Sequence, residues 1–252
     1  MVIKKRANII IITCLLCISF AGFAKEITKP NTFFQAKSIA RQLFIAYTET
    51  IYSGCSFDLL RRIDFTTCDF EHNPNIHRDK TIEFEHMLPM SNVKPQFACW
   101  TKPLCTNTKG KKYGGRRCCQ HMSRKFNQLE AELFNLWPEI GTINRIRSNY
   151  KFTEFTKSQK QQLGKYRGLP LHVDFKHKQI EPRDEAKGIV ARASLFMAKK
   201  YHIALSNDQL ELFNRWNQQY PPNKTEIFWA KQVARIEGYN NEFIIMENKR
   251  VD

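Results

Sequence analysis

Apolar residues near the start of the chain recur at helical spacing. The positions that repeat every three or four residues after Thr32 are Ala36, Ile39, Ala40, Leu43 and Tyr47. Thr32 and Gln35 can form a capping box in front of them. In such a box the Thr32 side chain accepts from the backbone amide of Gln35, and the Gln35 side chain accepts from the backbone amide of Thr32. We therefore predict that a helix begins directly after Thr32.

The last third of the chain predicts three more helices. The first covers residues 185–201. The second follows Ser206 and Gln209, another candidate capping box. Its apolar face carries Leu210, Phe213 and Trp216. The third covers residues 225–237 and ends at Gly238, since glycine commonly occupies the left-handed position after a helix.

The middle of the chain has a more varied pattern. Residues 81–88 predict a strand that ends at Pro89, and residues 171–180 alternate as a second strand would. Residues 102–113 are polar and rich in lysine, so we expect an exposed loop. One more helix is predicted to stop at Pro138, with a face made of Phe126, Leu129, Leu133 and Trp137.

These elements predict one mixed α+β domain over residues 25–252, with helices around a few strands. The whole chain has 252 residues, enough to bury its own core, and no stretch rich in Pro, Gly or Ser divides it. Residues 1–24 have the pattern of a secretory signal peptide: three basic residues, an apolar run, and small residues before Lys25. The alternative, a membrane anchor, fits less well because the apolar run is short.

The cysteines and the net charge indicate the compartment of the protein and the kind of partner it binds. Two of eight cysteines lie in the leader, and six remain: Cys55, Cys68, Cys99, Cys105, Cys118 and Cys119. An even number in an exported chain predicts disulfides. A zinc site at Cys118, Cys119 and His121 is the alternative, although vicinal cysteines are poor tetrahedral ligands. A formal net charge of +16 favours a polyanionic partner, either a nucleic acid or an acidic membrane surface.

Candidate chemistry gathers between residues 83 and 152. His86 can act as a general base, and Glu85 beside it can bind a metal ion. Asn144 can supply a second oxygen ligand, and hard oxygen ligands suit Mg²⁺. Arg116 can hold a phosphate. Each residue also has an ordinary alternative: a core histidine, a turn asparagine, or a solvated charge.

Several spaced motifs resemble the bacterial endonuclease I family, periplasmic or secreted non-specific nucleases of the ββα-metal superfamily. The matching segments run in one order over residues 35–245: Glu85-His86-Met87-Leu88-Pro89, Cys99-Trp100, Gly114-Gly115-Arg116, Glu130 to Pro138, Gly141 to Asn149 and Val173-Asp174-Phe175-Lys176. The loop between the first and third motifs is longer than usual, and the cysteine set differs. Ser53 stands where the family often has a cysteine, and Cys105 and Cys118 are additional.

The resemblance implies a strand–strand–helix catalytic unit that holds one Mg²⁺ ion. It makes His86 the general base and Glu85 and Asn144 the metal ligands. It makes Arg116 the phosphate-binding cation, and it adds Glu130, an acidic position near the site, to the catalytic residues. On this basis the nearby arginines are assigned to nucleic-acid binding: Arg117, Arg145 and Arg147. Neighbouring strand residues point to opposite faces, so the backbone must twist or end near Glu85 and His86 if both serve one cleft.

The combined interpretation is an exported, Mg²⁺-dependent, sequence-non-specific endonuclease of the periplasm or the medium. We expect it to act as a monomer on DNA, and on RNA too, without a membrane partner in its mature form. The rival is a non-catalytic, disulfide-rich nucleic-acid-binding protein. A disulfide between Cys99 and Cys119 would position Arg116, although the sequence leaves the pairing open.

Overall fold

We describe the fold from a computed structural model, which covers residues 28–45 and 48–244. The predicted signal peptide and Tyr47 lie outside these residues. The α-helices are α1 (Phe33–Leu43), α2 (Ala98–Thr101), α3 (Arg116–Met122), α4 (Arg124–Glu130), α5 (Gly141–Arg147), α6 (Lys157–Leu163), α7 (Asp184–Tyr201), α8 (Asn207–Gln219) and α9 (Lys224–Glu237). The strands are β1 (Ser56–Phe57), β2 (Ile63–Asp64), β3 (Ile82–His86), β4 (Cys105–Thr106), β5 (Lys112–Tyr113), β6 (Leu136–Ile140), β7 (Lys151–Phe152), β8 (His172–Asp174) and β9 (Gln179–Glu181).

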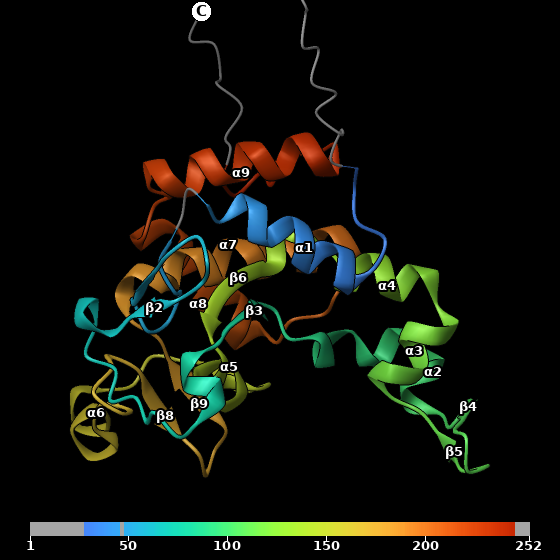
Figure 1. The fold of residues 1–252 in the computed structure, drawn as a ribbon, viewed down its shortest axis with the longest axis horizontal. Helices are drawn as coiled ribbons and strands as arrows, with labels where there is room; N and C mark the ends of the chain where they lie inside the picture. Colours follow the sequence, from blue (N-terminus) through green and yellow to red (C-terminus); the bar gives the residue numbers. More distant parts are fainter. Residues whose placement is uncertain (1–27, 46–47, 245–252) are drawn as a thin grey trace, which may run out of the picture.

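The centre of the molecule is a two-stranded antiparallel sheet made of β3 and β6. Ile82 pairs with Ile140 and His86 with Leu136, and β6 leads directly into α5. Helix α1 lies on one side of β3 and α5 on the other (Figure 1). This arrangement of two strands followed by a helix is the unit that the family resemblance implied.

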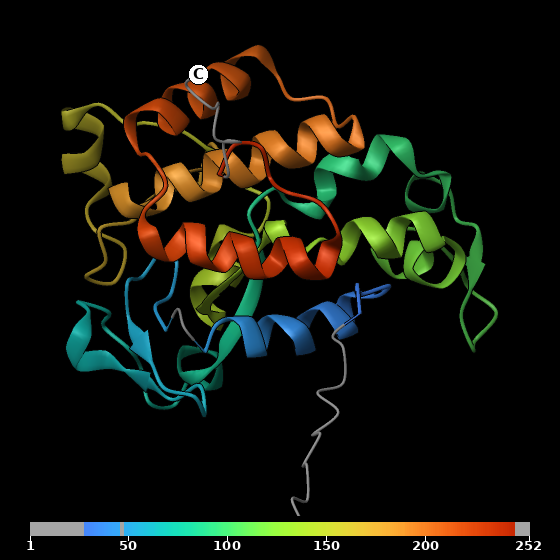
Figure 2. The same ribbon diagram turned by 90° about the horizontal axis from the view of Figure 1, so that it is seen from above.

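Helices bury the strand β6 on its far side. All five residues of β6 are buried, and Trp137 packs at a tilt of 45° against Trp229 of α9, with ring centroids 4.3 Å apart. Helices α7 and α8 pack side by side, and α9 lies over α1 (Figures 1 and 2). Residues 186–197 of α7 are buried on all sides. The strands are therefore short because helices, rather than a broad sheet, supply most of the core.

The predicted helices at the two ends of the chain are confirmed. Thr32 caps α1 and Ser206 caps α8 by accepting from the third backbone amide of each helix. Gln35 completes its half of the first box with the backbone amide of Asn31 instead of Thr32. Gly238 ends α9 with a φ of 81°, in the left-handed region that favours glycine.

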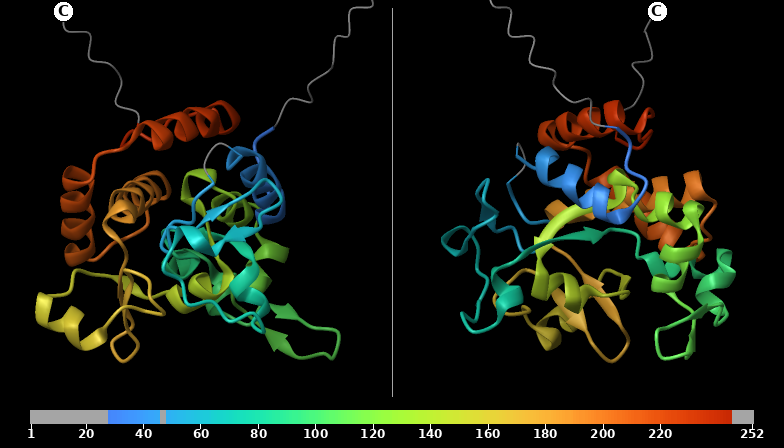
Figure 3. Two further views of the ribbon diagram at one scale, coloured as in Figure 1. Left: turned by 60° about the vertical axis from the view of Figure 1, so that its left-hand side comes forward. Right: turned by 45° about the vertical axis from the view of Figure 1, so that its right-hand side comes forward.

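Three local predictions were wrong. The helix over residues 126–137 ends at Glu130, and Trp137 and Pro138 belong to β6. Pro138 fits there because the described part of the sheet places no further strand beside β6. Residues 171–180 form two antiparallel strands, β8 and β9, instead of one. Residues 102–113, expected to be a loop, contain the hairpin β4–β5, which projects from the body (Figure 3).

All six described cysteines form disulfides. The pairs are Cys55–Cys68, Cys99–Cys119 and Cys105–Cys118. The zinc alternative is therefore wrong, because both vicinal cysteines are engaged. The structure confirms the α+β class, and none of the helices within the described ranges is long and apolar enough to span a membrane.

Candidate active site

The two faces of β3 carry different side chains to one cleft. Glu83 and Glu85 point to the α5 side, where Glu83 accepts from Asn144 and Glu85 pairs with Arg147. Phe84 and His86 point to the opposite side, where they contact rings of α1 and the residues just after it. The strand ends at His86, two residues before the predicted end at Leu88. The cleft lies along the edge of β3 that β6 does not cover, so both faces contribute to it without a twist.

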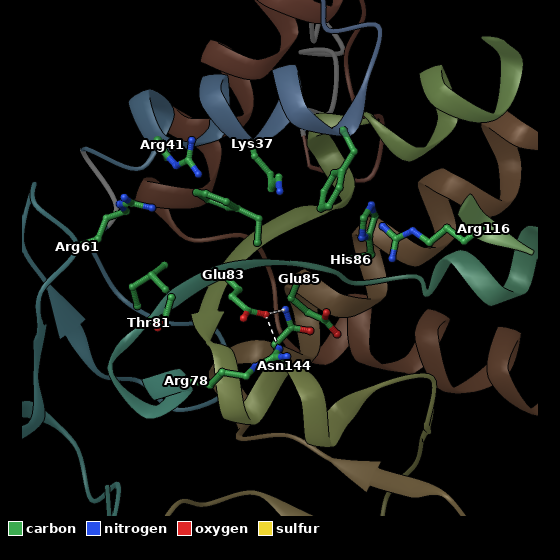
Figure 4. A pocket seen from close by; sticks show the side chains of 13 residues that line it. Lys37, Arg41, Arg61, Arg78, Thr81, Glu83, Glu85, His86, Arg116 and Asn144 are labelled. Carbon is green, nitrogen blue, oxygen red and sulfur yellow. Dashed lines mark hydrogen bonds and ion pairs between the residues drawn. The ribbon is translucent and has the colours of Figure 1, made fainter. Parts of the chain in front are cut away.

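The cleft has a volume of about 510 Å³ and is rich in cations. Five basic side chains line it: Lys37, Arg41, Arg61, Arg78 and Arg116. They surround two carboxylates, and Figure 4 shows them on all sides of Glu83 and Glu85. A positive cleft with low-dielectric walls attracts polyanions and concentrates them at its floor. Sequence motifs did not identify the cations of α1, because that helix was recognised only by its apolar face.

His86 is buried and held as a neutral base. Its Nε2 donates to the backbone carbonyl of Glu130 at 2.9 Å, since a carbonyl oxygen can only accept. Nδ1 is therefore left with its lone pair. Burial, and then the charge of Arg116, lower the pKa of His86 to about 3. The ring is fixed by Phe33, whose centroid lies 4.8 Å away.

Glu130 connects His86 to Arg116 without touching the cleft. Its carboxylate is buried and accepts from Arg116 Nε and, at 2.9 and 3.0 Å, from Gln120 Nε2. Its backbone carbonyl holds His86 at the same time. Arg116 begins α3 beside Cys119, and its side chain extends toward His86 (Figure 4). Glu130 thus occupies the predicted neighbourhood, where its contacts are those of a positioning residue.

Glu85 is a buried carboxylate with incomplete hydrogen bonding. Its side chain is 7% exposed, and Oε1 lies 3.0 Å from Arg147 Nη1 without forming a hydrogen bond. Burial, reinforced by Glu139 and opposed by Arg147, raises the pKa of Glu85 to about 7. The carboxylate therefore has an ion-pair partner in Arg147 and further acceptor capacity that could bind an ion.

Asn144 reaches the cleft from α5, and its amide is fixed from behind. Its Nδ2 donates to Glu83 Oε2 at 3.0 Å, which leaves Oδ1 as the group free to bind. Arg78 donates to the same carboxylate oxygen at 2.6 Å. Gly141 makes room for this arrangement, because a Cβ there would lie 2.8 Å from Glu83 Oε1. Sequence analysis missed Glu83, although its spacing of two from Glu85 places both on one face.

These residues fit a small divalent cation with oxygen ligands. Glu85 offers an oxygen that lacks a hydrogen bond, and Asn144 lies between Glu83 and Glu85 (Figure 4). Such a site uses few protein ligands and keeps several waters, as Mg²⁺ sites commonly do. No group of three or more His, Cys, Asp or Glu side chains suited to a metal occurs in the described residues.

The three arginines assigned to nucleic-acid binding differ in their surroundings. Arg117 and Arg145 are exposed on α3 and α5, where they can meet a ligand. Arg147 is only 1% exposed; it donates to the carbonyls of Met87 and Ser148 and pairs with Glu85. The assignment of Arg147 as a nucleic-acid contact is therefore corrected: its role is to hold Glu85 and the end of β3.

Comparison with known proteins places the chain in a family. The Endonuclease I family model matches residues 32–247. An extracellular deoxyribonuclease of Aeromonas hydrophila is 30% identical, over 91% of this chain and 96% of the relative. A periplasmic deoxyribonuclease of the same species is also 30% identical, over 85% of each. Endonuclease-1 of Buchnera aphidicola subsp. Baizongia pistaciae is 31% identical, over 85% of this chain and 83% of the relative. The chain therefore belongs to the endonuclease I family, and it is an endonuclease.

Proposed function

We propose that this protein is an exported, Mg²⁺-dependent, sequence-non-specific endonuclease that hydrolyses DNA, and RNA as well. The names of the relatives, extracellular and periplasmic deoxyribonuclease, support DNA as the substrate and export as the destination. Three disulfides also support folding in an oxidising compartment. The observation that carries the proposal is a neutral His86 beside an under-bonded Glu85 in a cationic cleft.

His86 has the geometry of a general base for water. Because Nε2 is occupied by the Glu130 carbonyl, Nδ1 is the atom that accepts the proton of the attacking water. The low pKa of His86 keeps this atom unprotonated throughout the neutral range. Arg116 then donates to the oxygens of the scissile phosphate as negative charge develops there.

Glu85 and Asn144 would hold the Mg²⁺ ion. When bound, the ion would act as a Lewis acid on the scissile phosphate and its leaving oxygen. Glu83 keeps the Asn144 amide turned with its oxygen toward the ion, and Arg147 keeps the Glu85 side chain in place.

The cleft favours binding of nucleic acids without regard to their base sequence. Its lining offers cations for phosphates, and phosphate contacts carry no sequence information directly. Such contacts also make no distinction between deoxyribose and ribose, which is why we include RNA. Binding by phosphate contacts should weaken steeply as salt is raised, by a similar factor for unrelated sequences.

Cleavage of a supercoiled plasmid and of a structured RNA tests the proposal. The wild-type protein should cleave both with Mg²⁺ and neither with EDTA. His86→Ala should reduce cleavage by roughly 10²–10⁴-fold while still binding DNA. His121→Ala, an exposed histidine on α3, is the matched control and should cleave normally.

Three results would contradict the proposal. Cleavage in EDTA would remove the metal from the reaction, and near-normal cleavage by folded His86→Ala would remove the general base. DNA binding without any cleavage by the wild type would favour the non-catalytic alternative. Recovery of a mature chain beginning at Lys25 from the periplasm or the medium would test export.

A further inference from the structure

A second groove opens from the proposed catalytic cleft at the start of β3. It has a volume of about 480 Å³ and shares Arg61, Thr81 and Ile82 with the cleft. In Figure 4, Arg61 and Thr81 lie at the opposite end of the cleft from His86 and Arg116. The two hollows therefore form one continuous path along the open edge of β3.

The groove is lined by both apolar and basic side chains, and its apolar share is larger than that of the catalytic cleft. The hairpin β1–β2 and the turn after it supply Leu60, Arg62 and Phe65, and the 3₁₀ helix before β3 supplies His77 and Lys80. Arg62 is paired with Asp58 at 2.6 Å, whereas Lys80 has no ion-pair partner among the residues of the described ranges. Apolar surface beside unpaired cationic charge suits a nucleotide, which has an apolar face and an anionic phosphate.

The hairpin that forms one wall is cross-linked at its base and hydrogen-bonded at its turn. The disulfide Cys55–Cys68 closes its base, directly before β1 and shortly after β2. Asp58 accepts from the backbone and the side chain of Arg62, at 2.9 and 2.6 Å, which fixes the turn. Arg61 has a φ of 61°, a conformation uncommon for a residue other than glycine, and its side chain enters the cleft.

This hairpin exposes two adjacent leucines, of which only one lines the groove. Leu59 is 69% exposed and Leu60 is 71% exposed, and Leu60 belongs to the groove wall. Single exposed apolar residues are common on protein surfaces and need no explanation. A leucine that a disulfide-closed hairpin holds beside cations, in a groove continuous with a cleft for phosphodiesters, indicates a binding role.

We propose that this groove is a subsite for the substrate strand on one side of the scissile phosphate, with Lys80 on a phosphate and Leu60 against a sugar or base. The proposal rests on the proposed nuclease function. Thr81 lies four residues before Glu85, or about 13 Å along an extended backbone. The groove would therefore receive the strand a few nucleotides from the cleaved bond.

Affinity for a fluorescent 20-base-pair duplex tests the subsite, with each change made in the His86→Ala protein so that the DNA stays intact. Leu60→Ser should weaken binding by about threefold to tenfold, as expected for the loss of partial apolar burial, with an unchanged salt dependence. Lys80→Ala should weaken binding and lower the slope of log K against log salt by about 0.9, the value for one phosphate contact.

The chain offers matched controls for both changes. Leu59→Ser alters an equally exposed leucine on the same hairpin outside the groove, and Lys231→Ala alters an exposed lysine on α9; both should bind as the His86→Ala parent does. Equal affinities of the Leu60→Ser and Leu59→Ser proteins, or an unchanged salt slope in Lys80→Ala, would overturn the subsite while leaving the nuclease intact. A parent protein that does not bind DNA would instead overturn the proposed function.

Discussion

Two buried glutamates of this protein, Glu85 and Glu132, have similarly raised pKa values but differ in how many hydrogen bonds they accept. In the cleft, Glu85 has an oxygen without a hydrogen bond. Behind β6, Glu132 accepts from Tyr201 and Tyr239 at 2.6 and 2.7 Å, and from the backbone amide of Phe134 at 3.3 Å. Burial raises the pKa of both carboxyls to about 7.

The difference indicates which buried acid is the better candidate for a ligand site. A perturbed pKa indicates a candidate site, but networks that only stabilise a fold perturb pKa values too. Glu132 and its neighbour Glu237 form a complete network, because Glu237 accepts from the backbone amide of Leu133 at 3.2 Å and pairs with Lys29 at 3.0 Å. Glu85 is paired with Arg147 at 3.0 Å, but its Oε1 has no hydrogen bond. We infer that the missing hydrogen bond, more than the pKa, marks the residue that awaits a ligand.

The largest expected effect comes from neutralising each acid in turn. Glu85→Gln should lower DNA cleavage by about 10²-fold or more, because Lewis-acid stabilisation of the transition state contributes several kcal/mol. Glu132→Gln should stay within about threefold of the wild type, provided that the protein is folded. Initial rates at saturating Mg²⁺, with circular dichroism of each variant, measure this. A reversed order of the two effects would break the comparison.

A smaller effect should follow from releasing the Asn144 amide. Glu83→Ala removes its acceptor, so the Mg²⁺ concentration for half-maximal activity should rise about tenfold, within the range for residues that orient metal ligands. Glu83→Gln keeps an acceptor oxygen and should recover part of the loss. A Mg²⁺ titration of both variants measures this. Equal titration curves for Glu83→Ala and the wild type would show that the contact has no positioning role.

The smallest effect concerns stability and pH in the complete network. Burial and Glu237 raise the pKa of Glu132, so the folded protein retains a proton that the unfolded chain has lost. The stabilisation is full below pH 4.5 and is lost as pH rises toward 7. Relative to Glu132→Gln, the wild type should lose unfolding free energy of the order of 1 kcal/mol across this window. Urea denaturation at pH 4.5 and at pH 7 measures this change in unfolding free energy. The control is Glu211→Gln, which alters an exposed acid on α8. The prediction would be contradicted if the difference in unfolding free energy between the wild type and Glu132→Gln were the same at both pH values.

The sequence predicted those parts of the structure that local chemistry determines. Capping residues such as Ser206 and stop signals such as Gly238 act within one helical turn, so their helices were predicted correctly. The proposed metal ligands and the proposed base came from a family motif, whose residues the fold brings into one cleft. The disulfide Cys99–Cys119 was suggested by its position around Arg116 and is present.

The rest depended on packing that local patterns do not contain. Trp137 repeated at helical spacing with Phe126, yet it lies in β6, because a short apolar run fits a strand equally well. Lys178 has a φ of 55° in a tight turn whose start Asp174 caps, which divides the expected long strand in two. Arg147 belongs to a basic motif, but only the fold shows that it turns inward to Glu85. Glu83 was missed because its importance lies in a partner on another element.

Metal binding by the two acidic regions gives the most direct test. Mg²⁺ or Mn²⁺ is titrated calorimetrically into the wild type, Glu85→Gln and Glu132→Gln without DNA. The under-bonded Glu85 predicts one ion per wild-type chain, binding weakened by at least about tenfold in Glu85→Gln, and wild-type binding in Glu132→Gln. Wild-type affinity and stoichiometry in a folded Glu85→Gln protein would contradict the assignment of this carboxylate as a metal ligand.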